Sequence, residues 1–539
     1  MSSPTADPLR RQVAELLVVR ASGHHHDSQR RYPRWELSNH ELQTLLAEGV
    51  GGVILLGGSS TELRERTKTL QSWSDQPLLF CADVEEGVGQ RFDGASWLVP
   101  PLALARLYQQ TPEAAVALAE AYGRCTGAQA RRCGLNWVLG PVCDVNNNPN
   151  NPVINVRAWG EDPTTAAQLT AAVQRGLDSA GVLGCAKHFP GHGDTALDSH
   201  LSLPVLPHQR ARLDAVELPP FKATIAAGVA SVMTGHLLLP ELDAEHPATL
   251  SHAVLTTLLR DELGFDGLVV TDALVMEAIT DQYGAAEAAV LAFAAGADLI
   301  LMPADAEAAI DGLCNAFRDG RLALSRLEQS LQRRRQALAR IRANHLPDTT
   351  PEPRPEVVTP EEQRLEQELV ACSLQINPGG TISASTGLNL VRVDSVLPSC
   401  HPLGGAAPAL ALPAAQGFHT VLIHGQGVSP WQADPDAPLA LDRLGDGPVL
   451  LQLFLRGNPF RGSQDSQEPW AAAIRQLLEV QRLAGLVVYG SPYLWDSFKP
   501  LLPEGLPAAY SPGQMPEAQC QVLTKLLAGT GSQAGAFTD

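Results

Sequence analysis

Eight short apolar runs, each separated from the next by a longer segment of helical periodicity, occupy the first 300 residues of the chain. The runs are rich in Val, Ile and Leu and carry few charges, which is typical of strands buried on both faces. The predicted strands cover residues 16–20, 52–56, 78–83, 135–145, 183–188, 231–236, 267–272 and 297–302. Buried strands that alternate with helices indicate a parallel sheet covered by helices.

The segments between the runs contain clear helix boundaries. Thr111 and Asp162 are followed by proline and begin two predicted helices, which end at Gly134 and Gly181. Eight such units in about 300 residues have the size of a TIM-type (β/α)₈ barrel, and a doubly wound open sheet is the competing architecture. Barrel enzymes carry their active sites at the carboxyl ends of the strands, so catalytic groups are expected directly after these runs.

A second domain is predicted beyond the barrel. After residue 302 we expect a long helix that begins at Ser325 with Glu328 as a capping box, and we interpret the run Arg333–Arg335 as its solvated face. The proline-rich segment 347–360 predicts a linker.

The division is therefore a catalytic (β/α)₈ barrel over 1–346, a linker over 347–360 and a smaller α/β sandwich domain over 361–539. Apolar runs predict strands of this second domain at 388–393, 421–424, 449–455 and 486–489.

Composition and charge narrow the possible partners. The chain is 45% hydrophobic and 18% charged, which indicates a folded globular protein. Its 39 basic and 58 acidic residues give a net charge of −19, which disfavours nucleic acid and anionic membranes as partners. The N-terminus has no apolar signal region, and the nine cysteines form no CxxC pair. We therefore expect a soluble, cytoplasmic protein.

The densest group of reactive side chains is the loop 187–200, directly after the fifth predicted strand. Three chemistries compete there. His188, His192 and Asp194 are possible ligands of a divalent metal. Ser199 is a possible nucleophile, although the GxSxG pattern is absent. Asp198 and His200 form a possible general acid/base pair.

Several carboxylates follow other strands of the predicted barrel. Asp272 ends the seventh run, where an acidic side chain faces the barrel mouth because the barrel core is apolar. Further acids follow the third and fourth runs: Asp83, Glu85, Glu86 and Asp144.

With these residues identified, the sequence resembles bacterial β-N-acetylglucosaminidases of glycoside hydrolase family 3. The loop KHFPGHG at 187–193, followed by DSH at 198–200, is similar to the signature of that subgroup. Segment 267–276 is similar to its nucleophile strand. Two further blocks, 83–92 and 157–163, occur in the family's order.

The resemblance implies a retaining exo-β-N-acetylglucosaminidase that removes terminal, non-reducing GlcNAc from β-linked glycosides, with peptidoglycan fragments as the expected substrate. Asp272 would attack the anomeric carbon and form a covalent glycosyl-enzyme, and His200, oriented by Asp198, would act as acid/base. The expected substrate-binding residues are Asp83, Arg91, Arg157, Lys187, His188, His236 and Met276. No metal or organic cofactor is required by this mechanism.

Two positions depart from the family pattern. Glu86 stands where the family usually has glycine, and Ala273 stands where a second acid usually follows the nucleophile. The rival interpretations are a β-glucosidase or xylosidase of the same family, a metal-dependent hydrolase that uses His188, His192 and Asp194, and a sugar-binding protein without activity. Every proposed catalytic group is present, which favours an enzyme.

Overall fold

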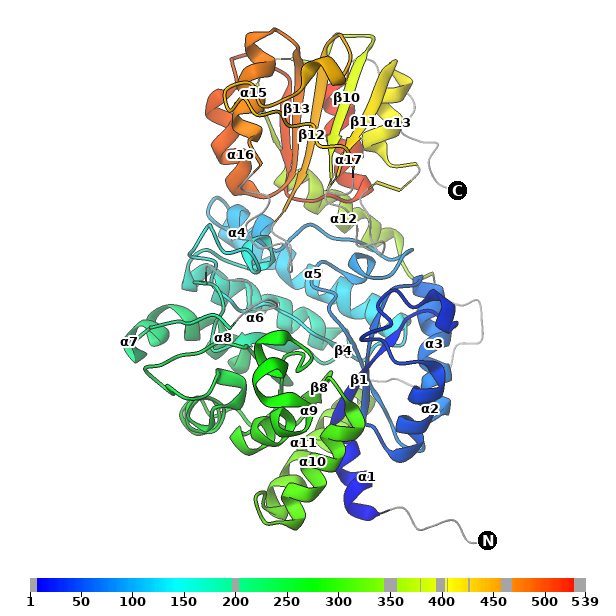
Figure 1. Ribbon diagram of the computed structural model, residues 1–539, viewed down its shortest axis with the longest axis vertical. Helices are drawn as coiled ribbons and strands as arrows, with labels where there is room; N and C mark the ends of the chain where they lie inside the picture. Colours follow the sequence, from blue (N-terminus) through cyan, green and yellow to red (C-terminus); the bar gives the residue numbers. More distant parts are fainter. Residues whose placement is uncertain are drawn as a thin grey trace.

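The computed structural model describes residues 7–195, 203–343, 356–378, 380–393, 403–404, 406–424, 427–456 and 468–527. Within these residues the chain forms a barrel with a sheet domain stacked on one end (Figure 1).

Eight parallel strands form the barrel. One sheet has the order β4-β3-β2-β1-β8 and a second has the order β5-β6-β7. Single parallel bridges between Trp137 and Leu183 and between Val270 and Leu299 join the two sheets at both edges. The predicted (β/α)₈ barrel is thus confirmed. Its strands are β1 (Leu17–Ser22), β2 (Gly52–Leu56), β3 (Leu79–Ala82), β4 (Trp137–Val138), β5 (Cys185–Phe189), β6 (Ser231–Thr234), β7 (Leu268–Val270) and β8 (Ile300–Leu301).

Helices cover the outside of the barrel, and both predicted helices are present. The Thr111 side chain, however, makes no cap hydrogen bond to the helix that follows it. The helix predicted after Asp162 begins with that side chain accepting the backbone N–H groups of Thr164 and Thr165. The helices are α1 (Pro8–Ala14), α2 (Asn39–Glu48), α3 (Ser60–Ser72), α4 (Leu102–Tyr108), α5 (Pro112–Arg132), α6 (Pro163–Ser179), α7 (Arg210–Arg212), α8 (Leu218–Ala226), α9 (Glu277–Ala295), α10 (Ala306–Arg318) and α11 (Leu324–Ala343), with a π-helical segment at Ala253–Glu262.

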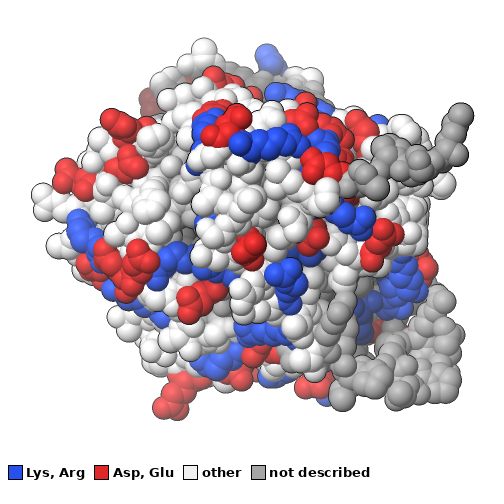
Figure 2. Space-filling model, turned by 90° about the horizontal axis from the view of Figure 1, so that it is seen from below, with Lys and Arg blue, Asp and Glu red and all other residues white. Residues whose placement is uncertain are grey.

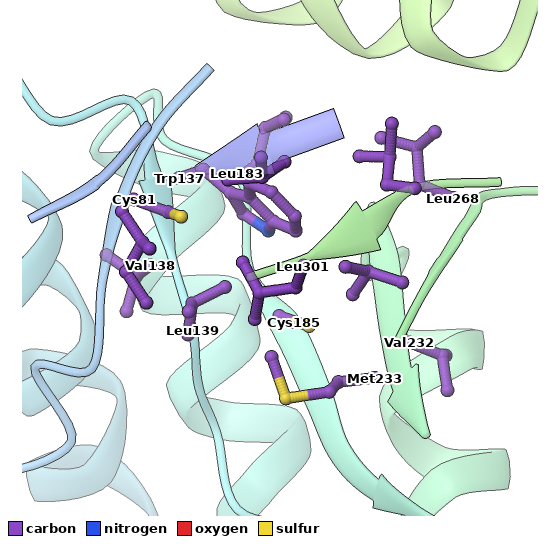
Figure 3. Close-up of a cluster of buried hydrophobic side chains, with 14 of the residues drawn as sticks. Cys81, Trp137, Val138, Leu139, Leu183, Cys185, Val232, Met233, Leu268 and Leu301 are labelled. Carbon is purple, nitrogen blue, oxygen red and sulfur yellow. The ribbon is translucent and has the colours of Figure 1, made fainter. Parts of the chain in front are cut away.

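Apolar side chains fill the centre of the barrel. Figure 3 shows Trp137 from β4 among Leu183, Leu268 and Leu301, all of them buried. The Trp137 indole N–H donates to the hydroxyl of Ser231 at 2.8 Å, so the one polar atom of this large ring is satisfied. The apolar core fills the barrel, so its interior is not a channel, and the catalytic groups are expected at the carboxyl ends of the strands.

One prediction about the end of the barrel domain was wrong, and another was right only in part. Ser325 lies inside α11, which begins at Leu324, so it is not the cap of that helix. The arginine run is only partly a solvated face: Arg335 is exposed, but Arg334 is buried and donates to the carbonyl oxygens of Gly51 and Pro77. Long guanidinium side chains reach back from α11 to the lower end of the barrel and satisfy free carbonyl groups there.

The second domain contains one six-stranded sheet of order β11-β10-β12-β13-β14-β9, parallel except for the antiparallel strand β9. Its four predicted strands are present, and the short strands β9 and β14 were not predicted. The elements are α12 (Pro360–Ser373), β9 (Gln375–Ile376), β10 (Gly387–Arg392), α13 (Pro408–Ala415), β11 (Phe418–Ile423), β12 (Val449–Leu455), α15 (Trp470–Glu479), β13 (Leu483–Gly490), α16 (Pro492–Phe498), β14 (Ala508–Ser511) and α17 (Pro516–Leu526).

Helix α12 lies between the two domains (Figure 1). Its residues Leu369 and Val370 belong to the same buried apolar cluster as the barrel core, and Glu362 pairs with Arg132 of α5. Most of the predicted linker, residues 347–355, lies outside the described residues. The division at 346 and 361 stays a prediction.

Basic and acidic side chains are interspersed over the end of the barrel that faces away from the sheet domain (Figure 2). Among the described residues, no helix has the length and apolarity that a membrane crossing requires.

Candidate active site

Lys187 is the centre of an ion cluster at the carboxyl ends of the barrel strands. It lies on β5, and its ammonium group is 2.7 Å from Asp83 Oδ1 and 2.6 Å from Glu85 Oε1, both of which follow β3. Its side chain is only 2% exposed. Burial disfavours its charged form, but the two carboxylates outweigh this and raise the pKa of Lys187. The cluster therefore holds a buried, charged donor at the barrel mouth.

Arg157 completes this cluster from the other side of Glu85. Its Nε and Nη2 atoms lie 2.7 and 2.9 Å from the two oxygens of Glu85, a bidentate pair. Burial would raise the pKa of Glu85, yet Arg157 and Lys187 hold it well below its usual value. Glu85 is thus an ionised bridge between two cations, each of which keeps donors for a ligand.

Asp83 is the most accessible acid of the cluster. Its side chain is 40% exposed, and its backbone carbonyl accepts from Arg91 Nε at 3.0 Å. An exposed carboxylate beside two basic side chains can accept hydrogen bonds from sugar hydroxyls, while the basic side chains donate to hydroxyl or amide oxygens. The four predicted residues Asp83, Arg91, Arg157 and Lys187 are therefore brought together.

A second buried network surrounds Asp144, which follows β4. His188 Nδ1 lies 2.8 Å from Asp144 Oδ2, and the backbone N–H of His192 donates to Oδ1 at 2.7 Å. Burial raises the pKa of Asp144, but His188 and the hydrogen bonds outweigh it, and the net pKa is lowered. Asp144 fixes the orientation of the His188 ring at the base of the loop that follows β5.

The groups weighed as metal ligands have other partners in this structure. Asp194 lies 3.2 Å from His208 and 3.5 Å from Arg212, whereas His188 faces Asp144. Among the described residues, no three His, Cys, Asp or Glu side chains are grouped as metal ligands would be. The side-chain geometry does not favour the metal-dependent alternative.

Asp272 lies two residues after β7, at the same end of the barrel as the Lys187 cluster. Its Oδ1 accepts the N–H of Ala273 at 2.8 Å, and its own N–H donates to Thr234 Oγ1 at 3.3 Å. His236 is buried and its Nε2 donates to the carbonyl of Ala273 at 3.1 Å. His236 therefore holds the turn that carries Asp272, and Met276 is buried at the start of α9.

Asp198, Ser199 and His200 lie outside the described residues, within 196–202. The acid/base role of His200 and the orienting role of Asp198 therefore stay predictions. The described part of the loop ends at Thr195, whose hydroxyl lies 2.9 Å from His192 Nδ1.

Sequence reasoning missed two parts of the site. Glu85 and Asp144 were noticed only as rim acids, although each holds a predicted sugar-binding residue in place. Glu86, the departure from the family pattern, is buried and pairs with Arg456 of the sheet domain. Glu85 and Asp144 were signalled by their positions directly after strands. The pairing of Glu86 has no local signal, because its partner Arg456 lies 370 residues away in the chain.

Curated relatives are similar to about half of the chain. Beta-hexosaminidase A of Pseudoalteromonas piscicida is 36% identical over 286 residues, which span 49% of this chain and 47% of that protein. A beta-hexosaminidase of Neisseria meningitidis serogroup C is 34% identical over 273 residues, covering 50% of this chain and 75% of the relative.

One solved structure resembles almost the whole chain. A glycoside hydrolase family 3 beta-N-acetylglucosaminidase from Paenibacillus sp. str. FPU-7 aligns with a TM-score of 0.77 and 28% identity, over 97% of this chain and 98% of that one. NagZ from Neisseria gonorrhoeae, solved with N-trifluoroacetyl-D-glucosamine, aligns over 66% of this chain and 97% of that one, with a TM-score of 0.53 and 27% identity.

Two family models match the chain in the order of its domains. The "Glycosyl hydrolase family 3 N terminal domain" matches residues 8–336, and the "Bacterial Glycosyl hydrolase family 3 C-terminal domain" matches residues 381–528. Since the first match alone covers more than half of the sequence, the chain belongs to glycosyl hydrolase family 3, as a glycoside hydrolase with the barrel followed by the sheet domain.

Proposed function

We propose that the chain is a retaining exo-β-N-acetylglucosaminidase that releases terminal GlcNAc from β-linked glycosides. The observation that carries this proposal is the cluster of Asp83, Glu85, Arg157 and Lys187, which gathers three separate family blocks at the barrel mouth. Relatives that match about half of the chain are named beta-hexosaminidases, which supports a 2-acetamido sugar as the substrate.

In the proposed reaction, Asp272 attacks the anomeric carbon while His200 protonates the leaving oxygen. A carboxylate suits this position because positive charge develops at the anomeric carbon in the transition state. Asp198 orients the imidazole and stabilises its protonated form. The same imidazole then activates the water that releases the sugar.

The Lys187 cluster holds the sugar during these steps. Its carboxylates accept from ring hydroxyls, and Arg157, Arg91 and Lys187 donate to hydroxyls and to the acetamide carbonyl. We further propose that the natural substrates are GlcNAc-containing peptidoglycan fragments in the cytoplasm, which gives the enzyme a role in peptidoglycan recycling.

A panel of aryl β-glycosides that differ only at the sugar 2-position tests the substrate. We expect the 2-acetamido glycoside to be cleaved roughly tenfold to a hundredfold better than the plain glucoside, because a buried donor left without the acetamide stays unpaired. Equal kcat/KM for the two would contradict the proposal and favour a β-glucosidase. Asp272→Ala enzyme, purified in parallel, measures any contaminating hexosaminidase.

The acid/base role is tested with His200→Ala and aryl glycosides of good and poor leaving groups. A phenol that leaves readily as its anion hardly needs an acid, so the variant should still glycosylate Asp272 and then stall. The expected result is a burst of phenol equal to the enzyme concentration and a mass increase of one N-acetylhexosaminyl unit. Equal loss for all leaving groups, with no adduct, would remove His200 from this role.

A further inference from the structure

Glu85 and Glu86 are adjacent in the chain, and their carboxylates form ion pairs with different parts of the molecule. Glu85 pairs with Lys187 and Arg157 inside the barrel mouth. Glu86 pairs with Arg456, whose Nη1 and Nη2 lie 3.0 and 2.6 Å from its two oxygens. Consecutive Cα atoms are only about 3.8 Å apart, so the position of Glu86 constrains that of Glu85. One peptide unit thus joins the sugar-site cluster to the sheet domain.

Glu86 is fixed by several hydrogen bonds, so a shift of Arg456 would also shift Glu86. Its side chain is 1% exposed, and Trp97 Nε1 donates to its Oε2 at 2.9 Å. Its N–H donates to Gln90 Oε1 at 3.0 Å, and its carbonyl accepts from Leu98 N–H at 2.7 Å. Every polar group of Glu86 therefore has a partner, and Arg456 is the only one of those partners that comes from the sheet domain.

Arg456 is positioned by the regular part of the sheet domain. It directly follows β12, and its side chain is 11% exposed. Gly490, at the end of the neighbouring strand β13, has φ +117, and a Cβ there would lie 2.3 Å from the carbonyl oxygen of Leu455. Only glycine permits this close approach of the two strand ends. The guanidinium group is thus presented from a rigid sheet.

A second contact of the sheet domain reaches the residues around Arg157. The Tyr493 hydroxyl donates to Glu161 Oε1 at 2.7 Å and accepts from Asn146 Nδ2 at 2.7 Å. Asn146 in turn accepts the N–H of Asn155, two residues before Arg157. These two contacts of the sheet domain, through Arg456 and Tyr493, therefore reach residues that flank the sugar-site cluster.

We infer that the sheet domain is a positioning element for the sugar site, and that Arg456 is the residue through which it acts. Arg456 touches no reacting atom; it fixes Glu86 and, through the shared backbone, the Glu85 carboxylate that orients Lys187 and Arg157. This inference rests on the proposed role of those residues in binding the sugar. It assigns to the second domain a role in the reaction that its separation in the sequence does not suggest.

The test compares Arg456→Met with the double variant Glu86→Gln/Arg456→Met in the full-length enzyme. Arg456→Met leaves a buried carboxylate unpaired and lowers the melting temperature, whereas the double variant removes both charges and regains stability. If Arg456 positions the site, kcat/KM for the 2-acetamido aryl glycoside falls by about 10- to 100-fold in both variants, with a rise in KM. Arg456→Lys keeps the charge but not the bidentate guanidinium contact, so it should recover part of the lost kcat/KM.

Asp496→Asn is the matched control, because Asp496 pairs with Arg106 across the same domain contact at an exposed position. It should leave KM and kcat unchanged. Recovery of wild-type kcat/KM in the double variant, together with its stability, would overturn the inference, since Arg456 would then be only structural. Failure of the proposed substrate would be seen in the wild-type enzyme, and failure of this inference only in the variants.

Discussion

Two buried ion clusters lie at opposite ends of the barrel and contain the same kinds of groups. At the lower end, Asp298 is fully buried before β8 and pairs with Arg260, Arg326 and Arg333. Its oxygens also accept from Ser330 Oγ at 2.7 Å and Val269 N–H at 3.0 Å. At the upper end, Lys187 and Arg157 share Glu85, and Asp83 remains 40% exposed.

The two clusters differ in the hydrogen-bond donors and acceptors that they leave available to a ligand. Asp298 accepts from three guanidinium groups, a hydroxyl and a backbone N–H, so its lone pairs are occupied by the protein. The upper cluster has one exposed carboxylate and cations with donors to spare. A saturated cluster stabilises the fold, whereas an unsaturated one can bind a ligand, in agreement with the usual roles of the two ends of such barrels.

The largest expected effect is that of removing the proposed nucleophile at the upper end. Asp272→Ala should lower turnover by roughly 10⁴-fold or more for every leaving group, because no glycosyl-enzyme can form. The melting temperature should stay close to that of the wild type. Asp266→Ala, at the exposed lower end of the same strand segment, is the control and should keep full activity. Retained turnover in Asp272→Ala would move the nucleophile elsewhere.

The reverse pattern is expected at the lower end. Asp298→Ala leaves three arginines without their shared carboxylate and should reduce the free energy of unfolding by about 3–5 kcal/mol. Urea denaturation measures this loss, with the exposed Asp319→Ala as the control. At a temperature where the variant is folded, its KM should equal that of the wild type. A changed KM would show that the lower cluster also shapes the site.

The barrel could be predicted from the sequence because its strands are mostly apolar and several of its helices begin at a capping side chain, such as Ser38, Ser59 and Asp162. The family blocks also predicted that Lys187, Arg157 and Asp83 lie at one end of the barrel, and the structure brings them together. Their role in binding a sugar stays a prediction. Non-local pairs could not be predicted. The Arg333–Arg335 run has the pattern of an exposed helix face, yet Arg333 reaches Asp298 and Arg334 reaches Gly51.

The same limit explains Glu86 and the short strands. From the sequence alone, Glu86 is recognisable only as an unusual acid beside Gly87. Its partner Arg456 belongs to another domain and is seen only in the structure. Strands β9 and β14 have two and four residues, too few to show a period. In both cases the deciding contact is with a residue far away in the sequence, which only tertiary folding brings close.

A smaller effect than that of Asp272→Ala or Asp298→Ala is expected for Lys187→Met. This substitution keeps the shape of the side chain but removes the buried cation. We expect kcat/KM for the 2-acetamido glycoside to fall by about 10²- to 10³-fold, as for the loss of one charged donor in an active site. Stability should change less than in Asp298→Ala, because Glu85 keeps its pair with Arg157. Lys222→Met, at an exposed ion pair, is the control.

The smallest effect concerns His192, which belongs to the Asp144 network and makes the stability of the protein depend on pH. Burial lowers the pKa of His192 to about 4 in the folded protein, against about 6.5 in the unfolded chain. As the pH falls from 6.5 to 4, the unfolded chain gains a proton on this ring that the folded protein does not accept. The free energy of unfolding should therefore fall in this window, by roughly 2–3 kcal/mol at most.

The carboxylates of the site act in a different pH range. The pKa values of Glu85 and Asp144 are lowered in the folded protein, so their stabilisation is present above about pH 4 and is lost only at lower pH. Urea denaturation of wild type and His192→Gln at pH 7, 6, 5 and 4.5 separates the two contributions. The variant should lose the slope between pH 6.5 and 4.5, while His40→Gln, at an exposed position, should keep it. An unchanged slope in His192→Gln would mean that the ring takes up its proton equally in the folded and unfolded states, and that the loop after β5 is more open to water than its burial indicates.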